Sequence, residues 1–350
     1  YLQIWWEEAE FEREQQKEFY QKYKQYLTRE SHKRRFDMLV HDGDRANALG
    51  IANVLGGGYV ALVEARLALA KKDPSANTLL KNVPAALQND PGLVYERLRW
   101  RRRNDLDTGA MALLAKAPDV RDMHSPKDWW LERHILARRM IEDKKYTQAY
   151  QIVTAHRQKE GLPFAQAEWL AGWLALRKKN EPAKAFQHFE KLYKGVKSPI
   201  SKARGAYWSG MASKALNSHE IAQKWFYVAA QYDTTFYGQM AQAILRRTSN
   251  FQSAGLPSGY QQYASRELAR AAKVLSRMQK KKEAGFFIAA LRRTANSAED
   301  LLNNARLADS MGYNNLSIRA ATQALSDHKV LNTKLSHPTR AQDMRNVNGV

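Results

Sequence analysis

Arginine is concentrated in one short segment of the chain, and this segment is the clearest chemical pattern in the sequence. Residues 97–103 contain one tryptophan, Trp100, and five arginines, which are Arg97, Arg99, Arg101, Arg102 and Arg103. Guanidinium groups hold anionic oxygen pairs, and aromatic rings supply stacking surfaces. The candidate ligand-binding residues are therefore Arg97, Arg99, Arg102 and Arg103. In the alternative interpretation, the arginines bridge neighbouring helices through Glu96, Asp105, Asp107, Glu132 and Glu142.

A single acidic residue, Glu168, interrupts the apolar segment from Ala165 to Leu176. A carboxyl group buried in an apolar helix has a raised pKa, which would suit acid/base chemistry. The alternative is a structural pair with an arginine of the neighbouring helix.

Other catalytic and metal-binding patterns are missing from the sequence. The nine histidines are dispersed and show no His-x-x-x-His spacing, and there is no cysteine, so we expect no metal site and no cofactor. No Gly-x-Ser-x-Gly nucleophile elbow occurs, although a dispersed Ser/His/Asp triad stays open. Gly56, Gly57 and Gly58 are not followed by Lys-Ser/Thr, and we interpret them as a turn. The sequence predicts no catalytic residue.

The charge balance favours an anionic partner. Lys and Arg number 56 against 35 Asp and Glu, which gives a formal net charge of +21. Nucleic acid, anionic lipid and an acidic cell-wall polymer all remain possible partners on this ground. No apolar run of 18 residues and no signal peptide is visible, so we expect no membrane span. The absence of cysteine excludes disulfides and fits any compartment.

Small residues recur at a spacing that indicates repeated helix pairs. Ala149, Ala185 and Ala222 are separated by 36 and 37 residues. Another small residue lies 12 or 13 positions upstream of each, at Ala137, Gly172 and Gly210. A large apolar residue lies four positions downstream of each, at Val153, Phe189 and Phe226. The pairing returns as Ala272/Ala284 and Ala308/Ala320. Antiparallel helices need small residues where they cross closely, so the sequence predicts an all-α right-handed solenoid of TPR-like helix pairs, shaped as a horseshoe or ring.

Prolines and turn residues divide this array. Prolines 74, 91, 126, 163, 182 and 199 stand at or just before predicted helix starts. The segment 252–260 contains two glycines and a proline and is the best internal boundary. We therefore predict a superhelical domain over 1–251, a helical linker domain over 252–335, and a segment over 336–350 that leads to a further domain outside this chain. The first residue is not methionine, which suggests a processed or truncated chain.

Several long segments resemble one enzyme family, in the same order along the chain. They are Pro91–Arg103, Trp129–Arg139, Phe164–Arg177, Pro199–Trp208 and Thr235–Ala241. Together these segments, spread over roughly residues 30 to 335, resemble the non-catalytic superhelical region of the periplasmic soluble lytic murein transglycosylases. The resemblance implies a periplasmic protein whose superhelix precedes a lysozyme-like domain. That domain cleaves the MurNAc–GlcNAc linkage of peptidoglycan and leaves a 1,6-anhydro end, with one glutamate as acid and then base.

The family's catalytic motif is a Glu-Ser pair followed about twenty residues later by Gly-Leu-Met-Gln. This chain has one such pair, Glu30-Ser31, in a polar helix, and no Gly-Leu-Met-Gln follows it. We therefore expect the catalytic domain to begin beyond Val350 and these residues to be non-catalytic alone. The leading hypothesis is a scaffold that docks the catalytic domain and guides anionic glycan strands. A free-standing helical-repeat adaptor is the alternative; nucleic-acid binding ranks third, and we expect no nucleic acid as a partner.

Overall fold

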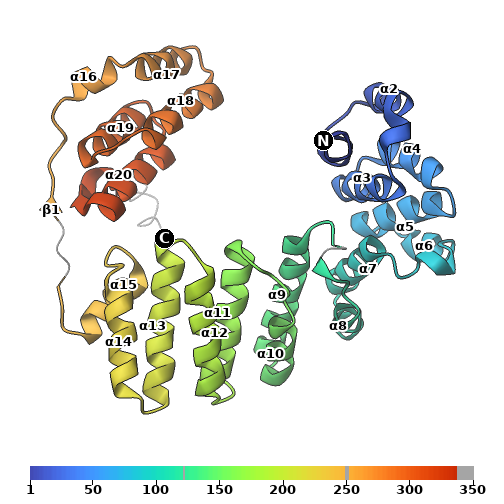
Figure 1. Ribbon diagram of the computed structural model, residues 1–350, viewed down its shortest axis with the longest axis horizontal. Helices are drawn as coiled ribbons and strands as arrows, with labels where there is room; N and C mark the ends of the chain where they lie inside the picture. The colour runs from blue at the N-terminus through green and yellow to red at the C-terminus, as the bar shows by residue number, and fades with distance from the viewer. Residues whose placement is uncertain (121–122, 249–251, 337–350) are drawn as a thin grey trace, which may run out of the picture. The chain divides into compact units, whose positions relative to one another are not determined.

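The chain is helical almost throughout, as the sequence predicts. The computed structural model describes residues 1–120, 123–248 and 252–336 (Figure 1). The exception to helix and turn in this part is one parallel pair of two-residue strands, β1 (Gln252–Ser253) and β2 (Val330–Leu331). The prediction of an all-α protein is confirmed.

The helices follow one another with short connections. Up to residue 120 they are α1 (Leu2–Glu8), α2 (Arg13–Tyr23), α3 (Arg29–Asp42), α4 (Arg45–Leu55), α5 (Tyr59–Lys71), α6 (Ala76–Lys81), α7 (Pro91–Arg103) and α8 (Asp107–Ala115), with 3-10 turns Lys24–Tyr26 and Ala85–Leu87. The next are α9 (Pro126–Glu142), α10 (Tyr146–Thr154), α11 (Gly161–Arg177), α12 (Pro182–Gly195), α13 (Pro199–Ala215), α14 (His219–Ala230) and α15 (Phe236–Ile244). The last are α16 (Tyr260–Ala264), α17 (Glu267–Arg277), α18 (Lys281–Arg293), α19 (Ala298–Ser310), α20 (Asn314–His328) and α21 (Thr333–Ser336).

The chain divides into two compact units, Tyr1–Trp225 and Phe226–Val350, and the division falls inside α14. It lies N-terminal to the boundary that the sequence suggests at residue 252. The domain assignment 1–251, 252–335 and 336–350 stays a prediction, and all but the first residue of its last segment lies outside the described residues.

Within the first unit the helices form a two-layered array. Helices α3, α5, α7, α9, α11 and α13 each contact the next in that series, and α4, α6, α8, α10 and α12 each pack against the helix before them. This consecutive packing of helix pairs confirms the predicted repeat (Figure 1). The hand of the array and its closure into a ring stay predictions.

The small residues of the repeat lie where the paired helices touch. Ala137, Ala149 and Ala185 have no exposed surface, and Gly172 and Gly210 are buried. A Cβ atom on Gly172 would lie 2.5 Å from the ring of Phe189, which fills the space left by the missing side chain. The predicted pairing of a small residue on one helix with a large one on the next is therefore confirmed for α11 and α12.

Replacing Gly172 by alanine is expected to lower the free energy of unfolding by about 1–3 kcal/mol, because the added methyl group displaces the Phe189 ring. Urea unfolding followed by circular dichroism would measure this. Gly285 in α18 is the matched control, since its added Cβ would meet only Leu316 at an ordinary 3.8 Å. There the better helix propensity of alanine predicts a gain of about 0.5–1 kcal/mol. Equal effects at the two sites would contradict the packing argument.

Proline marks helix starts as the sequence predicts, except that Pro163 is the third residue of α11. Pro91, Pro126, Pro182 and Pro199 each occupy the first helical position, where a missing backbone N–H costs nothing. At α7 the side chain of Asp90 also accepts a hydrogen bond from the Leu93 amide at 2.9 Å. The helix that carries the arginine segment therefore has a fixed beginning.

Extended residues and caps separate the helices at two places. Residues 1–41 form α1, α2 and most of α3, because Ala9 at the end of α1 and Thr28 before α3 are both extended. Helix α15 starts at Phe236, where Thr235 caps the Gly238 amide, and it ends at Ile244.

The second unit repeats the pairing with its own core. Helices α17 and α18 pack together, as do α19 and α20. Ala272, Ala284, Ala308 and Ala320 have no exposed surface, as the second pair of repeats predicts.

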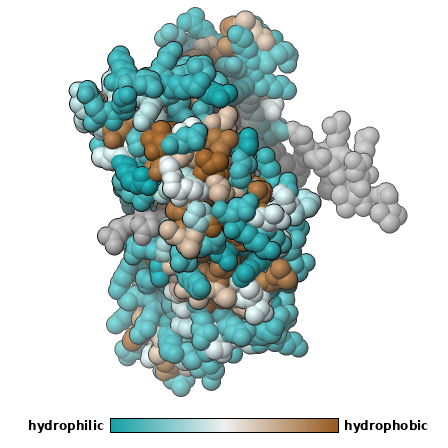
Figure 2. Space-filling view, turned by 90° about the vertical axis from the view of Figure 1, so that its right-hand side faces the viewer, coloured by the Kyte–Doolittle hydropathy of each residue, from teal (hydrophilic) through white to brown (hydrophobic). Residues whose placement is uncertain are grey.

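One side of the molecule is mainly polar. Figure 2 shows a side of the molecule on which hydrophilic residues predominate and hydrophobic residues gather in small groups. Of the helices in the described ranges, none combines the length and the apolar composition that crossing a bilayer requires.

Candidate anion-binding groove

A polar groove of about 420 Å³ lies between α3, α7 and α9. We call it the α3–α7–α9 groove. It is lined by His41 from α3, by Tyr95, Arg99, Arg102 and Arg103 from α7, and by Asp128, Leu131 and Glu132 from α9. All of these residues belong to the first unit.

The local sequence explains why these side chains converge. Leu93, Val94 and Leu98 of α7 are buried in the core. Tyr95, Arg99, Arg102 and Arg103 follow at steps of four, three and one, so they share another face of the same helix. On α9, Trp129 and Trp130 are buried and hold Asp128 and Glu132 toward α7.

The structure brings three of the four candidate arginines together. Arg99, Arg102 and Arg103 line the groove, and Arg97 does not. The Arg97 guanidinium instead donates to the carbonyl oxygen of Gln88 at 3.4 Å. Burial, followed by the nearby charge of Arg101, lowers the pKa of Arg97. Ligand binding by these arginines stays a prediction.

The three groove arginines differ in what holds them. Arg102 donates to both carboxylate oxygens of Glu132, at 2.7 and 2.6 Å, and the Glu132 side chain is only 1% exposed. Arg103 Nη1 donates to the carbonyl oxygen of Ala70 at 2.6 Å. Arg99 Nη1 lies 3.6 Å from the nearest carboxylate oxygen of Glu96, beyond hydrogen-bond distance. Arg102 therefore bridges two helices, as the alternative interpretation predicts. Arg139 does the same, since it contacts Asp107 at 2.7 Å.

Replacing Arg102 by glutamine is expected to lower the free energy of unfolding by about 2 kcal/mol, because it leaves the buried Glu132 carboxylate without its bidentate donor. The Arg102→Gln/Glu132→Gln double variant should recover part of the loss, since no buried charge then remains. Urea unfolding of both single variants and the double variant gives the coupling energy. A coupling indistinguishable from zero would contradict a structural role for this pair.

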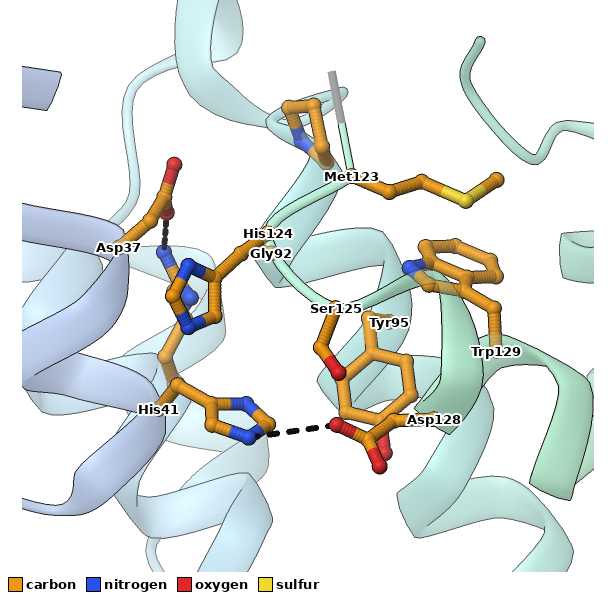
Figure 3. Close-up of a pocket in the computed structure, with 11 residues that line it drawn as sticks. Asp37, His41, Gly92, Tyr95, Met123, His124, Ser125, Asp128 and Trp129 are labelled. Carbon is orange, nitrogen blue, oxygen red and sulfur yellow. Dashed lines mark hydrogen bonds and ion pairs between the residues drawn. The ribbon is translucent and has the colours of Figure 1, made fainter. Parts of the chain in front are cut away.

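A narrower pocket adjoins the groove and shares His41, Tyr95 and Asp128 with it (Figure 3). His41 Nε2 lies 3.3 Å from Asp128 Oδ2, and the ring of His124 lies 5.0 Å from the His41 ring. Partial burial lowers the pKa of His124, and the adjacent His41 lowers it further. The His124 ring therefore stays neutral near pH 7.

A buried arginine forms the wall of this pocket. Arg66 is 3% exposed and contacts the carboxylates of Asp37 and Asp90. Its guanidinium lies against the backbone of Gly92, where an added Cβ would come within 2.1 Å of Arg66 Cζ. Burial raises the pKa of Asp90, while the Arg66 charge opposes the rise.

Sequence reasoning missed His41, His124, Asp128 and Arg66. One signal was present, since Arg66 interrupts the apolar helix α5, and a charge at such a position marks a buried ion pair or a site. The histidines carry no local signal, because His41 and His124 meet only through packing.

Glu168 is buried, as the sequence predicts, but its chemistry differs from both interpretations. Its carboxylate accepts from His156 Nε2 at 3.0 Å and His188 Nδ1 at 2.7 Å, and it also contacts Lys191 Nζ. Burial alone would raise the pKa of Glu168, but these hydrogen bonds outweigh it and hold the pKa well below its usual range. The predicted raised pKa is wrong, and the partners are histidines and a lysine instead of an arginine.

Further hydrogen bonds hold both histidine rings beside Glu168, and one of them fixes the tautomer of His156. The amide of Gln158 donates to His156 Nδ1 at 2.8 Å, and the Tyr150 hydroxyl lies 2.9 Å from His188 Nε2. His156 thus accepts at Nδ1 and donates to Glu168 from Nε2, and His188 faces Glu168 with Nδ1. An ionised, fully paired carboxylate is a structural anchor and a poor general acid.

The remaining candidates show no site. Glu30 lies exposed in the first turn of α3, 3.8 Å from Arg34, and Ser31 hydrogen-bonds with Thr28 at the helix cap. Across residues 1–120, 123–248 and 252–336, no three metal-ligating side chains come together.

Comparison with solved structures finds a likeness of fold. No family model matches the chain, and no curated protein matches it. A solved structure of an inactive mutant of the lytic transglycosylase Slt from Pseudomonas aeruginosa matches with a TM-score of 0.60 at 15% identity. The match covers 98% of this chain and 54% of that chain, so the chain spans about half the length of that enzyme. At this identity the likeness establishes a shared fold, which is an all-α array of helix pairs.

Proposed function

We propose that the chain is the superhelical scaffold region of a peptidoglycan lytic transglycosylase, which docks the catalytic domain and guides anionic glycan strands. The observation that carries this proposal is the fold match, which runs through 98% of this chain and leaves nearly half of the transglycosylase uncovered. In this proposal the uncovered part corresponds to the catalytic domain, and the chain belongs in the periplasm and is non-catalytic alone.

The charge of the chain supports a polyanionic substrate. A net charge of +21 attracts carboxylate-bearing peptidoglycan at a distance of about a Debye length, roughly 10 Å at 0.1 M salt. The attraction is weak for each contact and spread over the surface, which suits a scaffold that guides a strand without holding it tightly.

Co-sedimentation with purified sacculi tests the proposal. We expect binding at about 0.05 M salt that is largely lost at about 0.3 M, because salt screens exposed charges. The same preparation should release no anhydro-muropeptides. Absence of sedimentation at low salt, or tighter binding to duplex DNA than to sacculi at physiological salt, would refute the proposal.

A free-standing adaptor is the second candidate, favoured by one apolar helix face. Phe236, Met240 and Ile244 are spaced by four on α15, and all three are exposed. Met240→Glu would abolish recognition of a protein partner on this face and leave sacculus binding unchanged.

A further inference from the structure

The α3–α7–α9 groove carries positive charge that its own carboxylates do not neutralise. Two carboxylates line it, and both are engaged: Glu132 by Arg102, and Asp128 by His41. Arg99 and Arg103 are the remaining arginines of the lining. The hydrogen bond from Arg103 to Ala70 ends on a neutral carbonyl, so that contact leaves the charge of Arg103 uncompensated.

Arg99 is the arginine best placed to reach a ligand. Its side chain is 37% exposed, whereas that of Arg102 is 16% exposed. The nearest acid, Glu96, forms an ion pair with Arg99 at 3.6 Å, which is longer than a hydrogen bond. Arg99 therefore keeps donors available for a ligand.

The groove has the size and the walls for a small acidic group. Its volume of about 420 Å³ is within the usual range for ligand sites. Leu131, which is 51% exposed, adds an apolar wall, and two guanidinium groups match the oxygen pair of a carboxylate. Peptidoglycan offers such groups on its sugar lactyl ethers and on its stem peptides.

We propose that the α3–α7–α9 groove is a carboxylate-binding subsite in which Arg99 and Arg103 contact the ligand and Arg102 is a positioning residue held by Glu132. The identification of the ligand as a peptidoglycan carboxylate rests on the proposed function. The carboxylate belongs either to a sugar lactyl group or to a stem peptide.

Titration calorimetry at about 0.05 M salt tests the subsite with three soluble probes. They are GlcNAc-MurNAc, which carries the lactyl carboxylate, GlcNAc-MurNAc-tetrapeptide, which carries peptide carboxylates, and neutral chitotetraose. We expect at least one acidic probe to bind and chitotetraose to show no heat of binding. Whichever acidic probe binds identifies the source of the carboxylate, and binding of chitotetraose with equal affinity would overturn the subsite.

Charge-matched variants separate the groove from general attraction. Arg99→Gln should weaken binding of the acidic probe about tenfold or more, since a charge-assisted hydrogen bond is lost. Arg138→Gln removes the same charge from an exposed position on α9 outside the groove lining and should leave affinity within about twofold. Arg103→Gln should weaken binding of the acidic probe as Arg99→Gln does. The melting temperature of the Arg99→Gln variant should equal that of the native chain. Equal losses for Arg99→Gln and Arg138→Gln would overturn the subsite.

The outcomes distinguish the subsite from the proposed function. If the native chain sediments with sacculi but binds neither acidic probe, the subsite is wrong and the scaffold proposal stands. If sedimentation is unchanged by Arg99→Gln/Arg103→Gln while the acidic probe still binds that variant, the subsite is also wrong. If the native chain fails to sediment with sacculi at low salt, the proposed function itself is wrong.

Discussion

Replacing Glu168 by alanine is expected to lower the free energy of unfolding by about 3–5 kcal/mol, because a buried, fully hydrogen-bonded charge is removed from its partners. The side chain is 1% exposed, and His156, His188 and Lys191 all lose their acceptor. Urea unfolding followed by far-ultraviolet circular dichroism gives the change.

Glu190→Ala is the control for this loss. Glu190 forms an ion pair of 2.9 Å with Lys194 on the surface of α12, and its removal should cost less than about 1 kcal/mol. A Glu168 effect no larger than that of Glu190 would contradict an anchoring role.

The same residue predicts how stability depends on pH. Its folded pKa lies below the ordinary value of 4.5, so its stabilising contribution is fully present above pH 4.5 and declines as the pH falls below it. Between about pH 5 and pH 3 the native chain should therefore lose stability more steeply than Glu168→Gln. Parallel curves for the two proteins would show that the folded pKa of Glu168 is not depressed.

Replacing Arg35 by alanine should destabilise the N-terminal helices by a similar amount, about 3–5 kcal/mol, because several buried contacts depend on one guanidinium group. Arg35 is fully buried and donates to Gln16 Oε1 at 2.7 Å and to the carbonyl oxygen of Trp6 at 2.6 Å. It also lies over the rings of Trp6 and Phe11. Burial lowers the pKa of Arg35 to about 10, so the group stays charged at neutral pH.

The expected consequence is that α1 and α2 separate from α3, which limited proteolysis and hydrogen exchange would detect. Arg34→Ala is the matched control, since the neighbouring Arg34 side chain is 63% exposed and forms ion pairs with Glu7 and Glu30. Protection of α1 that survives in Arg35→Ala would contradict the argument.

The helices and the pairing of neighbouring helices can be predicted from local patterns in the sequence. Proline at the first helical position and small residues at a repeating spacing are local or nearly local signals, because they act on one helix or on adjacent helices. Gly172 is an example: the sequence places it 17 residues before Phe189, and the ring does fill the space above it. The sequence also identified Arg97, Arg99, Arg102 and Arg103 as candidates, but only the packing of α7 against α3 and α9 showed that three of them line one groove and that Arg97 does not.

The pairing of the buried charges, in contrast, depends on how helices distant in sequence pack together. Glu168 is paired by residues 12 and 20 positions away, Arg102 by one 30 positions away, and His41 by one on a helix far along the chain. Such partners depend on the axial position and the rotation of one helix relative to the helix it packs against. The periodicity of a single helix carries no information about either. The direction of the Glu168 pKa shift could not be predicted for the same reason. Burial raises this pKa and the hydrogen-bonding partners lower it, and the positions of the partners determine which effect is larger.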